Sequence, residues 1–219
     1  MKSNWHIRQK QRTIFSKIYN LNLWESLESV SGPGSTLAYT ENLRIDLPNF
    51  LKDLEIESIL DGPCGDFNWM AKTLDFSKIS YLGVDVVPKI ILNNKKKYAR
   101  TGINFRVLDL TTQEIPKADL MLCRDFLFHL SYIDTARFFR NFLRSKIPYL
   151  LTSNHINYGD FRNQDIQTGS FKRIDLSAAP YSLDLTNCKR IMDYVTPFPP
   201  RELVLITRDI VDRDFIHQF

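Results

Sequence analysis

Short apolar runs alternate along the chain with longer segments in which apolar residues recur every three or four positions. The runs are bounded by turn residues and predict buried strands, whereas the longer segments predict helices. Such an alternation is typical of an α/β fold with a parallel sheet. The expected strands are Ile56–Asp61, Tyr81–Val84, Asn104–Leu108, Ala118–Cys123, Pro148–Ser153 and Glu202–Thr207.

Two helices are expected ahead of the first strand. Residues 5–24 form the first helix, with Ile14, Ile18 and Leu21 on one apolar face. The second helix covers residues 37–54 and bends at its internal proline. The segment before the first strand therefore predicts a helical cap.

A further helix is expected directly after the first strand, over residues 66–74. Its apolar residues Phe67, Met70 and Leu74 recur at helical spacing and predict a face that points into the core. Trp69 lies off that face and is expected to be partly exposed.

Each of the first three expected strands has an acidic residue at its carboxyl end. Asp61 is the last residue of the first strand, and Asp85 and Asp109 directly follow the second and the third. The first of them leads into a turn that contains Gly62 and Gly65. The carboxyl ends of parallel strands meet at one edge of the sheet, where open α/β sheets bind their ligands. The sequence therefore predicts a ligand crevice lined by the three aspartates.

Two kinds of ligand use an acidic residue about 20 residues beyond a glycine turn. A nicotinamide dinucleotide needs further small residues beside its diphosphate, but Pro63, Cys64 and Phe67 occupy this turn and the helix start. A nucleoside with a cationic sulfonium and an amino-acid tail has no phosphate, and it is attracted by carboxylates in a partly desolvated crevice. The pattern favours this second ligand, with the three aspartates facing its ammonium group, ribose hydroxyls and adenine edge in chain order.

Three sequence blocks stand out: Ser-Gly-Pro-Gly-Ser at 31–35, Asp-Gly-Pro-Cys-Gly-Asp-Phe-Asn-Trp-Met at 61–70 and Cys-Arg-Asp-Phe-Leu-Phe-His-Leu at 123–130. They resemble class I S-adenosylmethionine (SAM)-dependent methyltransferases, and in particular a bacterial group that we associate with surface-glycan gene neighbourhoods. The resemblance covers roughly residues 30 to 155. It departs from the wider family where Pro63 and Cys64 replace the commoner middle glycine.

The resemblance implies a Rossmann-like fold, with a seven-stranded sheet covered by helices on both faces, and SAM as the cofactor. It places the ribose at Asp85 and Val86 and the adenine at Asp109 and Leu110. Arg124 is expected on the cofactor side, because a guanidinium stays protonated and cannot act as a base.

The loop at residues 29–35 has two glycines around a proline, with serines on both sides. Such a turn exposes backbone N–H groups that can bind a carboxylate. We expect the loop to close over the methionine end of SAM through Gly32 and Ser35, with Arg44 as a second carboxylate partner. A plain turn between two helices is the alternative.

The polar residues that follow the fourth strand are the catalytic candidates, because the resemblance places the transferred methyl group there. Asp125 and His129 stand four positions apart, so a helical turn would present both to one side. Histidine has a pKa near neutrality and can act as a general base, and the carboxylate would either orient it or contact the acceptor. The alternative is a core histidine beside a turn aspartate.

A long polar segment follows the fifth strand at residues 154–165. Loops of this length in compact domains are usually functional or disordered. We interpret this one as the wall of the acceptor site, with a flexible surface excursion as the alternative. The candidate acceptor residues are Asn154, His155, Arg162, Asn163 and Asp165.

The length of 219 residues and the 43% hydrophobic content fit one domain. It is expected to comprise a helical cap (1–54), a cofactor-binding core (55–153) and an acceptor-side loop with edge strands (154–219).

The net charge of +4 is too small to imply nucleic acid. A basic, acid-free stretch at residues 1–24 predicts either a solvated helix face or peripheral approach to phosphorylated or membrane-attached substrates.

Three widely spaced cysteines, Cys64, Cys123 and Cys188, have neither the spacing of a zinc site nor the density of a disulfide scaffold. No metal is expected, and a reducing cytoplasm fits this usage. No apolar stretch is long enough for a membrane span, and no signal peptide is expected.

The sequence thus favours SAM-dependent O-methylation of a small or carbohydrate-containing acceptor, such as a surface-glycan sugar. N-methylation of an amino sugar or a protein amine is one alternative, because an uncharged amine needs less help from a base. A SAM-binding protein without catalysis is another. Methylation of DNA amino groups is disfavoured, since Arg124-Asp125-Phe126 stands where an Asp/Asn-Pro-Pro-aromatic motif would be required.

Overall fold

The computed structural model describes residues 2–215, so Met1 and residues 216–219 of the expected domain lie outside the described part. The strands are β1 (Ser58–Asp61), β2 (Ser80–Asp85), β3 (Ile103–Val107), β4 (Leu120–Cys123), β5 (Tyr149–His155), β6 (Arg190–Met192) and β7 (Arg201–Thr207). The helices are α1 (Lys2–Asn20), α2 (Glu41–Lys52), α3 (Pro88–Tyr98), α4 (Tyr132–Ser145) and α5 (Arg208–Phe215).

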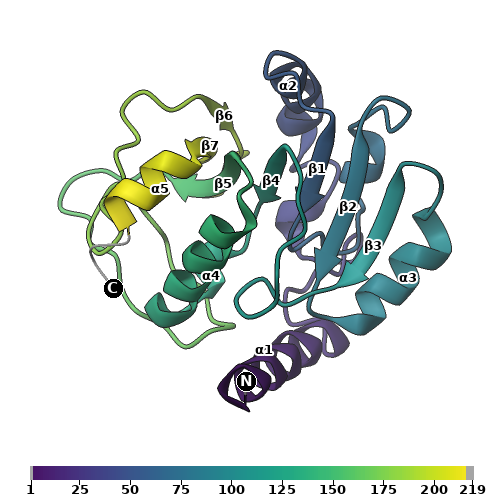
Figure 1. Cartoon of the computed structure of the whole chain (residues 1–219), viewed down its shortest axis with the longest axis horizontal. Helices are drawn as coiled ribbons and strands as arrows, with labels where there is room; N and C mark the ends of the chain where they lie inside the picture. The colour runs from purple at the N-terminus through teal and green to yellow at the C-terminus, as the bar shows by residue number, and fades with distance from the viewer. Residues whose placement is uncertain (1, 216–219) are drawn as a thin grey trace.

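Within residues 2–215 the strands form one seven-stranded sheet in the order β3-β2-β1-β4-β5-β7-β6 (Figure 1). β7 is antiparallel to both of its neighbours, and the other pairs are parallel. The order reverses between β1 and β4, so the crevice between their carboxyl ends is the place where this kind of sheet binds ligands.

The sheet is covered on both faces, because successive strand residues point to opposite sides. In β1, Leu60 packs into the core beneath α4 and α5, whereas Ile59 packs into the core beneath α2. The same alternation is seen in β4, β5 and β7. The expected α/β architecture, with helices on both faces of a seven-stranded sheet, is confirmed.

Helix α1 lies across the carboxyl ends of β2 and β3 rather than on a face of the sheet (Figure 1). Its Gln11 Nε2 donates to Thr111 Oγ1 over 3.0 Å, which ties the helix to the turn after β3. Ile18 is buried, but Leu21 is exposed because the helix ends at Asn20. The expectation that Leu21 shares the apolar face was wrong.

The segment after β1 is a series of turns with one short 3-10 helix at Met70–Lys72, not the expected helix over residues 66–74. Phe67 has a left-handed backbone (φ 59°), which interrupts a helix at its start. The expected inward residues are buried. Trp69 is buried as well, against expectation, because the Arg124 guanidinium lies over its ring.

Strand β5 extends to His155, two residues beyond the expected end. The following connection, residues 156–189, has no helix or strand in the structure, yet it is anchored to the domain by buried side chains. Ile174, Leu176 and Tyr181 are fully buried in the core beneath α4. The polar residues expected to form an acceptor wall therefore belong partly to β5 and partly to a packed connection.

Candidate functional site

The turn after β1 brings the backbone close to the second and third strands. A side chain at Gly62 would place its Cβ 2.7 Å from Val84 Cγ2 and 3.0 Å from Leu110 Cδ1, so only glycine fits. Gly65 has a φ of 51°, and its N–H donates to Asp85 Oδ2 over 3.3 Å. The turn is thus held against the carboxyl end of β2.

Asp61 and Asp85 are buried carboxyls at adjacent strand ends. Tyr81 Oη donates to Asp61 Oδ2 over 2.5 Å, and Val87 N donates to Asp85 Oδ1 over 2.9 Å. Burial raises the pKa of Asp61 to about 7 and the pKa of Asp85 to about 6, despite these hydrogen bonds. Both carboxyls therefore titrate close to neutral pH.

Asp109 has one carboxylate oxygen without a partner. Its Oδ1 accepts from Thr111 N over 2.8 Å and from Thr111 Oγ1 over 2.7 Å, whereas its buried Oδ2 has no hydrogen-bond partner in the structure. An unpaired buried carboxylate oxygen is costly unless a ligand satisfies it. Asp109 therefore marks the position of a hydrogen-bond donor on a ligand.

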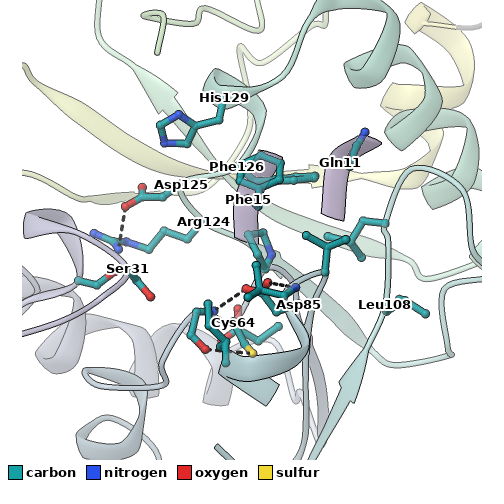
Figure 2. A pocket seen from close by; sticks show the side chains of 18 of the residues that line it. Gln11, Phe15, Ser31, Cys64, Asp85, Leu108, Arg124, Asp125, Phe126 and His129 are labelled. Atoms are coloured by element: carbon teal, nitrogen blue, oxygen red, sulfur yellow. Dashed lines mark hydrogen bonds and ion pairs between the residues drawn. The ribbon is translucent and has the colours of Figure 1, made fainter. Parts of the chain in front are cut away.

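The three aspartates line one cavity, called the first cavity here, which encloses about 870 Å³ including space open to solvent. Figure 2 shows its lining, with Gln11 and Phe15 from α1 opposite Cys64 and Asp85. Its lining combines apolar and aromatic side chains with a few polar groups, which is typical of small-molecule sites. The expected cofactor residues that line it are Ser35, Asp61, Gly65, Asp85, Val86, Asp109, Leu110 and Arg124.

The loop at residues 29–35 borders this cavity and is fixed at both ends. Asp66 Oδ1 accepts from Ser29 Oγ over 2.9 Å, and Asp66 Oδ2 accepts from Val30 N over 3.0 Å. At the other end, Arg124 Nη2 donates to the Gly34 carbonyl over 2.7 Å. The loop is a structured wall rather than a free turn.

Two expected partners of the methionine end lie apart from the first cavity. Gly32 lines a neighbouring cavity instead. Arg44 lines neither cavity, and its Nη2 donates to the Leu37 carbonyl over 3.0 Å. The geometry thus gives Arg44 a local partner and no contact with the site.

Four charged side chains form a closed network at the end of β4. Arg124 donates to both Asp193 oxygens at 2.8 and 2.9 Å, and Arg201 contacts Asp125 Oδ1 at 2.8 Å and Asp193 Oδ2 at 3.2 Å. Arg124 Nη1 also contacts Asp125 Oδ2 at 3.1 Å. Two guanidinium groups thus neutralise two carboxylates, and burial makes each pairing strongly interdependent.

Asp125 is held ionised by this network. Burial alone would raise its pKa, but Arg124 and Arg201 hold the pKa of Asp125 below its ordinary value. Its backbone is left-handed (φ 56°) rather than helical, and its N–H donates to Ser153 Oγ over 3.0 Å. A carboxylate with two arginine partners is a poor base, and the His129 ring is held by the Ser170 carbonyl instead of by Asp125, against the expectation that the carboxylate orients it.

His129 ends a short 3-10 helix, Leu127–His129, and lies beside the first cavity with Asp125. Its Nδ1 is 2.8 Å from the Ser170 carbonyl, which can only accept, so the proton is on Nδ1. Burial lowers the pKa of His129, which keeps the ring neutral at neutral pH. Nε2 is therefore free to accept a proton.

A second cavity adjoins the first and shares Trp24, Ser31, Asp125 and His129 with it. Residues from the loop at 29–35, from the end of β5 and from the start of β7 complete it. The catalytic candidates thus lie at the junction of two cavities, which suits the transfer of a group between two ligands.

Of the five expected acceptor residues, only His155 lines the second cavity. Asn154 Oδ1 accepts from Leu176 N over 2.8 Å, and Asn163 Nδ2 donates to the Asp175 carbonyl over 2.8 Å. Asp165 Oδ1 accepts from Tyr132 N over 2.7 Å, and Arg162 is exposed. The geometry gives Asn154, Asn163 and Asp165 local structural partners.

Three residues at this junction had no signal in the sequence reading. Arg201 and Asp193 complete the charge network. Arg201 lies 76 positions after its partner Asp125, and Asp193 lies 69 positions after its partner Arg124. Trp24, whose ring centroid lies 5.5 Å from that of His129, follows the end of α1. Arg201 begins β7 and Asp193 directly follows β6, and a single charged residue at a strand end carries no local signature, so only the sheet order reveals these contacts.

Within residues 2–215, no group of three or more His, Cys, Asp or Glu side chains is arranged to hold a metal ion. In the same range, no helix has the length and apolar character that crossing a membrane requires.

No protein-family model matches the chain, and no curated protein does. Among solved structures, a SAM-dependent methyltransferase from Leishmania major has a TM-score of 0.64 at 17% identity, with 86% of this chain and 82% of that chain covered. Magnesium protoporphyrin IX methyltransferase from Synechocystis, with bound SAM, has a TM-score of 0.58 at 13% identity, with 90% and 97% covered. The chain therefore has the Rossmann-like methyltransferase fold.

Proposed function

We propose that this protein is a SAM-dependent methyltransferase that acts on an oxygen of a small acceptor. The observation that carries the proposal is the first cavity, in which three strand-end aspartates converge and one of them keeps an unpaired buried oxygen. The fold shared with methyltransferases, one of them solved with bound SAM, supports it.

The residues present fit SAM. In this proposal Asp109 Oδ2 accepts from the adenine amino group and Asp85 accepts from the ribose hydroxyls; both residues are buried, and Asp109 Oδ2 has no partner among the described residues. Asp61 ends β1 directly before the glycine turn, and its carboxylate, when ionised, attracts the ammonium group. Pro63 and Cys64 line the same cavity and leave no cradle for a diphosphate.

When bound, SAM supplies an electrophilic methyl group on a sulfonium that leaves as a neutral thioether. The protein then has two tasks, alignment of the acceptor and removal of its proton. The free Nε2 of His129 is the proton acceptor in this proposal. Asp125, fixed by two arginines, favours the protonated imidazole through its charge.

N-methylation of an amine and SAM binding without catalysis remain the competing functions. An uncharged amine needs no base before attack, so its methylation would not depend on His129. A carbohydrate-containing acceptor, including a surface-glycan sugar, belongs to the proposal as an expectation from the sequence resemblance. A peripheral approach of such an acceptor through the basic residues of α1 belongs to it as well.

The test of SAM binding is an Asp109→Asn variant in titration calorimetry. The substitution keeps the oxygen that Thr111 fixes and replaces the unpaired Oδ2 by a donor, so SAM should bind about 10- to 100-fold more weakly. Asp75→Asn, on an exposed turn, is the matched control and should bind like the wild type. NADH binding in place of SAM would overturn the proposal.

Binding of SAM should also weaken as the pH falls from 8 to about 5.5, as expected for carboxyls with raised pKa values. Asp61, with a pKa of about 7, and Asp85, with a pKa of about 6, become protonated in this range and lose their attraction for the ligand. Calorimetry across this pH range measures the affinity for SAM. In the Asp85→Asn variant, the loss of affinity around pH 6 should disappear, and the loss around pH 7 should remain. A constant affinity would show that neither carboxylate contacts SAM.

A further inference from the structure

The second cavity has aromatic walls that remain open to solvent. Phe171 and Phe198 line it and are 58% and 43% exposed, although large apolar side chains are usually buried. Tyr39 contacts Phe198 edge to face, with ring centroids 5.1 Å apart, and Pro33 and Pro199 extend the apolar surface. Exposed aromatic residues around a hollow are typical of a site for a ligand with an apolar face.

The charges around this cavity are already paired. Asp125 and Arg201 line it, but each is bound into the four-residue network, with Asp193 and Arg124 as the other members. His129 and His155 are neutral at neutral pH, because burial lowers the pKa of His129 and lowers that of His155 to about 4. Among the described residues that line the cavity, no cation is left to bind a carboxylate or a phosphate.

The two histidines offer opposite hydrogen-bonding groups. His129 Nδ1 donates to the Ser170 carbonyl, so its Nε2 is an acceptor. His155 Nδ1 accepts from Ile174 N over 3.3 Å, so its proton is on Nε2, which is a donor. Both rings contact Phe128 and Phe171, with centroid distances of 4.7 to 6.1 Å, and therefore belong to one wall.

We propose that the acceptor binds in the second cavity and is an uncharged ring compound with an apolar face, whose hydroxyl donates to His129 Nε2 and whose second oxygen accepts from His155 Nε2. The inference rests on the proposed methyl transfer and names its substrate class. The hydroxyl proton passes to His129 as the oxygen gains the methyl group. A phenol and a neutral sugar both supply this chemistry.

Methylation assays with four probes test the substrate class. Catechol and methyl α-rhamnopyranoside are uncharged, whereas protocatechuate and methyl α-glucopyranosiduronate carry a carboxylate. The purified protein with excess SAM should methylate at least one neutral probe, detected by mass spectrometry, at a rate at least about tenfold above its charged counterpart. The neutral probe that reacts identifies the source as phenolic or sugar-derived. Equal rates within a pair, or no product from either neutral probe, would overturn the inference.

Variants test the location of the acceptor. Phe171→Ala should raise KM for the reactive probe about tenfold with little change in kcat. Tyr158→Ala is the matched control, because it is 79% exposed in the segment 154–165 and lies outside the cavity. The opposite outcome, in which only Tyr158→Ala raises KM, would place the acceptor on that segment.

His155 binds the acceptor directly in this proposal, and His155→Asn isolates its role. Asparagine keeps an acceptor for Ile174 N and removes the Nε2 donor, so KM should rise about 5- to 10-fold while the pH profile of kcat is unchanged. An unchanged KM would exclude the second hydrogen bond. SAM affinity, measured separately by calorimetry, distinguishes failure of this inference from failure of the proposed function.

Discussion

Replacing His129 by asparagine should lower kcat about 10²- to 10⁴-fold, the usual contribution of a general base. Asparagine can still donate to the Ser170 carbonyl, as His129 Nδ1 does over 2.8 Å, but it has no group at the position of Nε2. The loss should therefore come from proton removal rather than from local unfolding. Single-turnover kinetics with SAM and the reactive acceptor measure the effect.

The control for this variant is SAM affinity, which should change far less than kcat, because the aspartates of the first cavity remain in place.

The activity should also follow the ionisation of the imidazole. Because burial lowers the pKa of His129, kcat should decline only at a pH below the ordinary histidine value. A variant with wild-type turnover would favour an amine acceptor over a hydroxyl.

Replacing Asp193 by alanine should destabilise the protein by about 3–5 kcal/mol, as expected when one partner of a buried ion pair is removed. The Asp193 side chain has no exposed surface and contacts both arginines of the network. Its loss leaves the two guanidinium groups with Asp125 alone. Urea denaturation followed by circular dichroism measures the free energy of unfolding.

Asp75→Ala serves as the comparison for Asp193→Ala, because Asp75 is exposed and its ion pair with Lys78 lies at the surface. Surface pairs usually contribute no more than about 1 kcal/mol, so this variant should stay close to the wild type. If Asp193→Ala lowered the free energy of unfolding by a similarly small amount, water or a rearrangement of neighbouring groups would have to compensate the charges of the two arginines. The network would then be unnecessary for the fold.

The strand-end aspartates could be predicted from the sequence because their signal is local. An apolar run followed by Asp61 and glycines defines a strand and its turn without reference to the rest of the chain. The sheet places Asp85 and Asp109 at the same edge through parallel pairing of β1, β2 and β3. All three aspartates line the first cavity, and their contacts with SAM stay a prediction.

The acceptor side could not be predicted in the same way, because it depends on contacts between distant segments. The polar composition of residues 154–165 suggested a binding wall, yet Asn154 and Asn163 use their amides to fix the backbone. The aromatic residues Phe171 and Phe198 belong to two irregular connections, and they line the same cavity only through the packing of those connections. Hydrophobic periodicity carries no information about such connections.

The position of β7 has a consequence for the order in which the site matures during synthesis. Arg201 opens a strand that inserts between β5 and β6, and it supplies a counter-ion to Asp125. A nascent chain that has emerged only as far as β5 already contains His129 and the aspartates of the first cavity, but it lacks this arginine. We therefore expect a product that ends before β7 to lack the counter-ion that fixes Asp125, and with it the proposed methyl transfer.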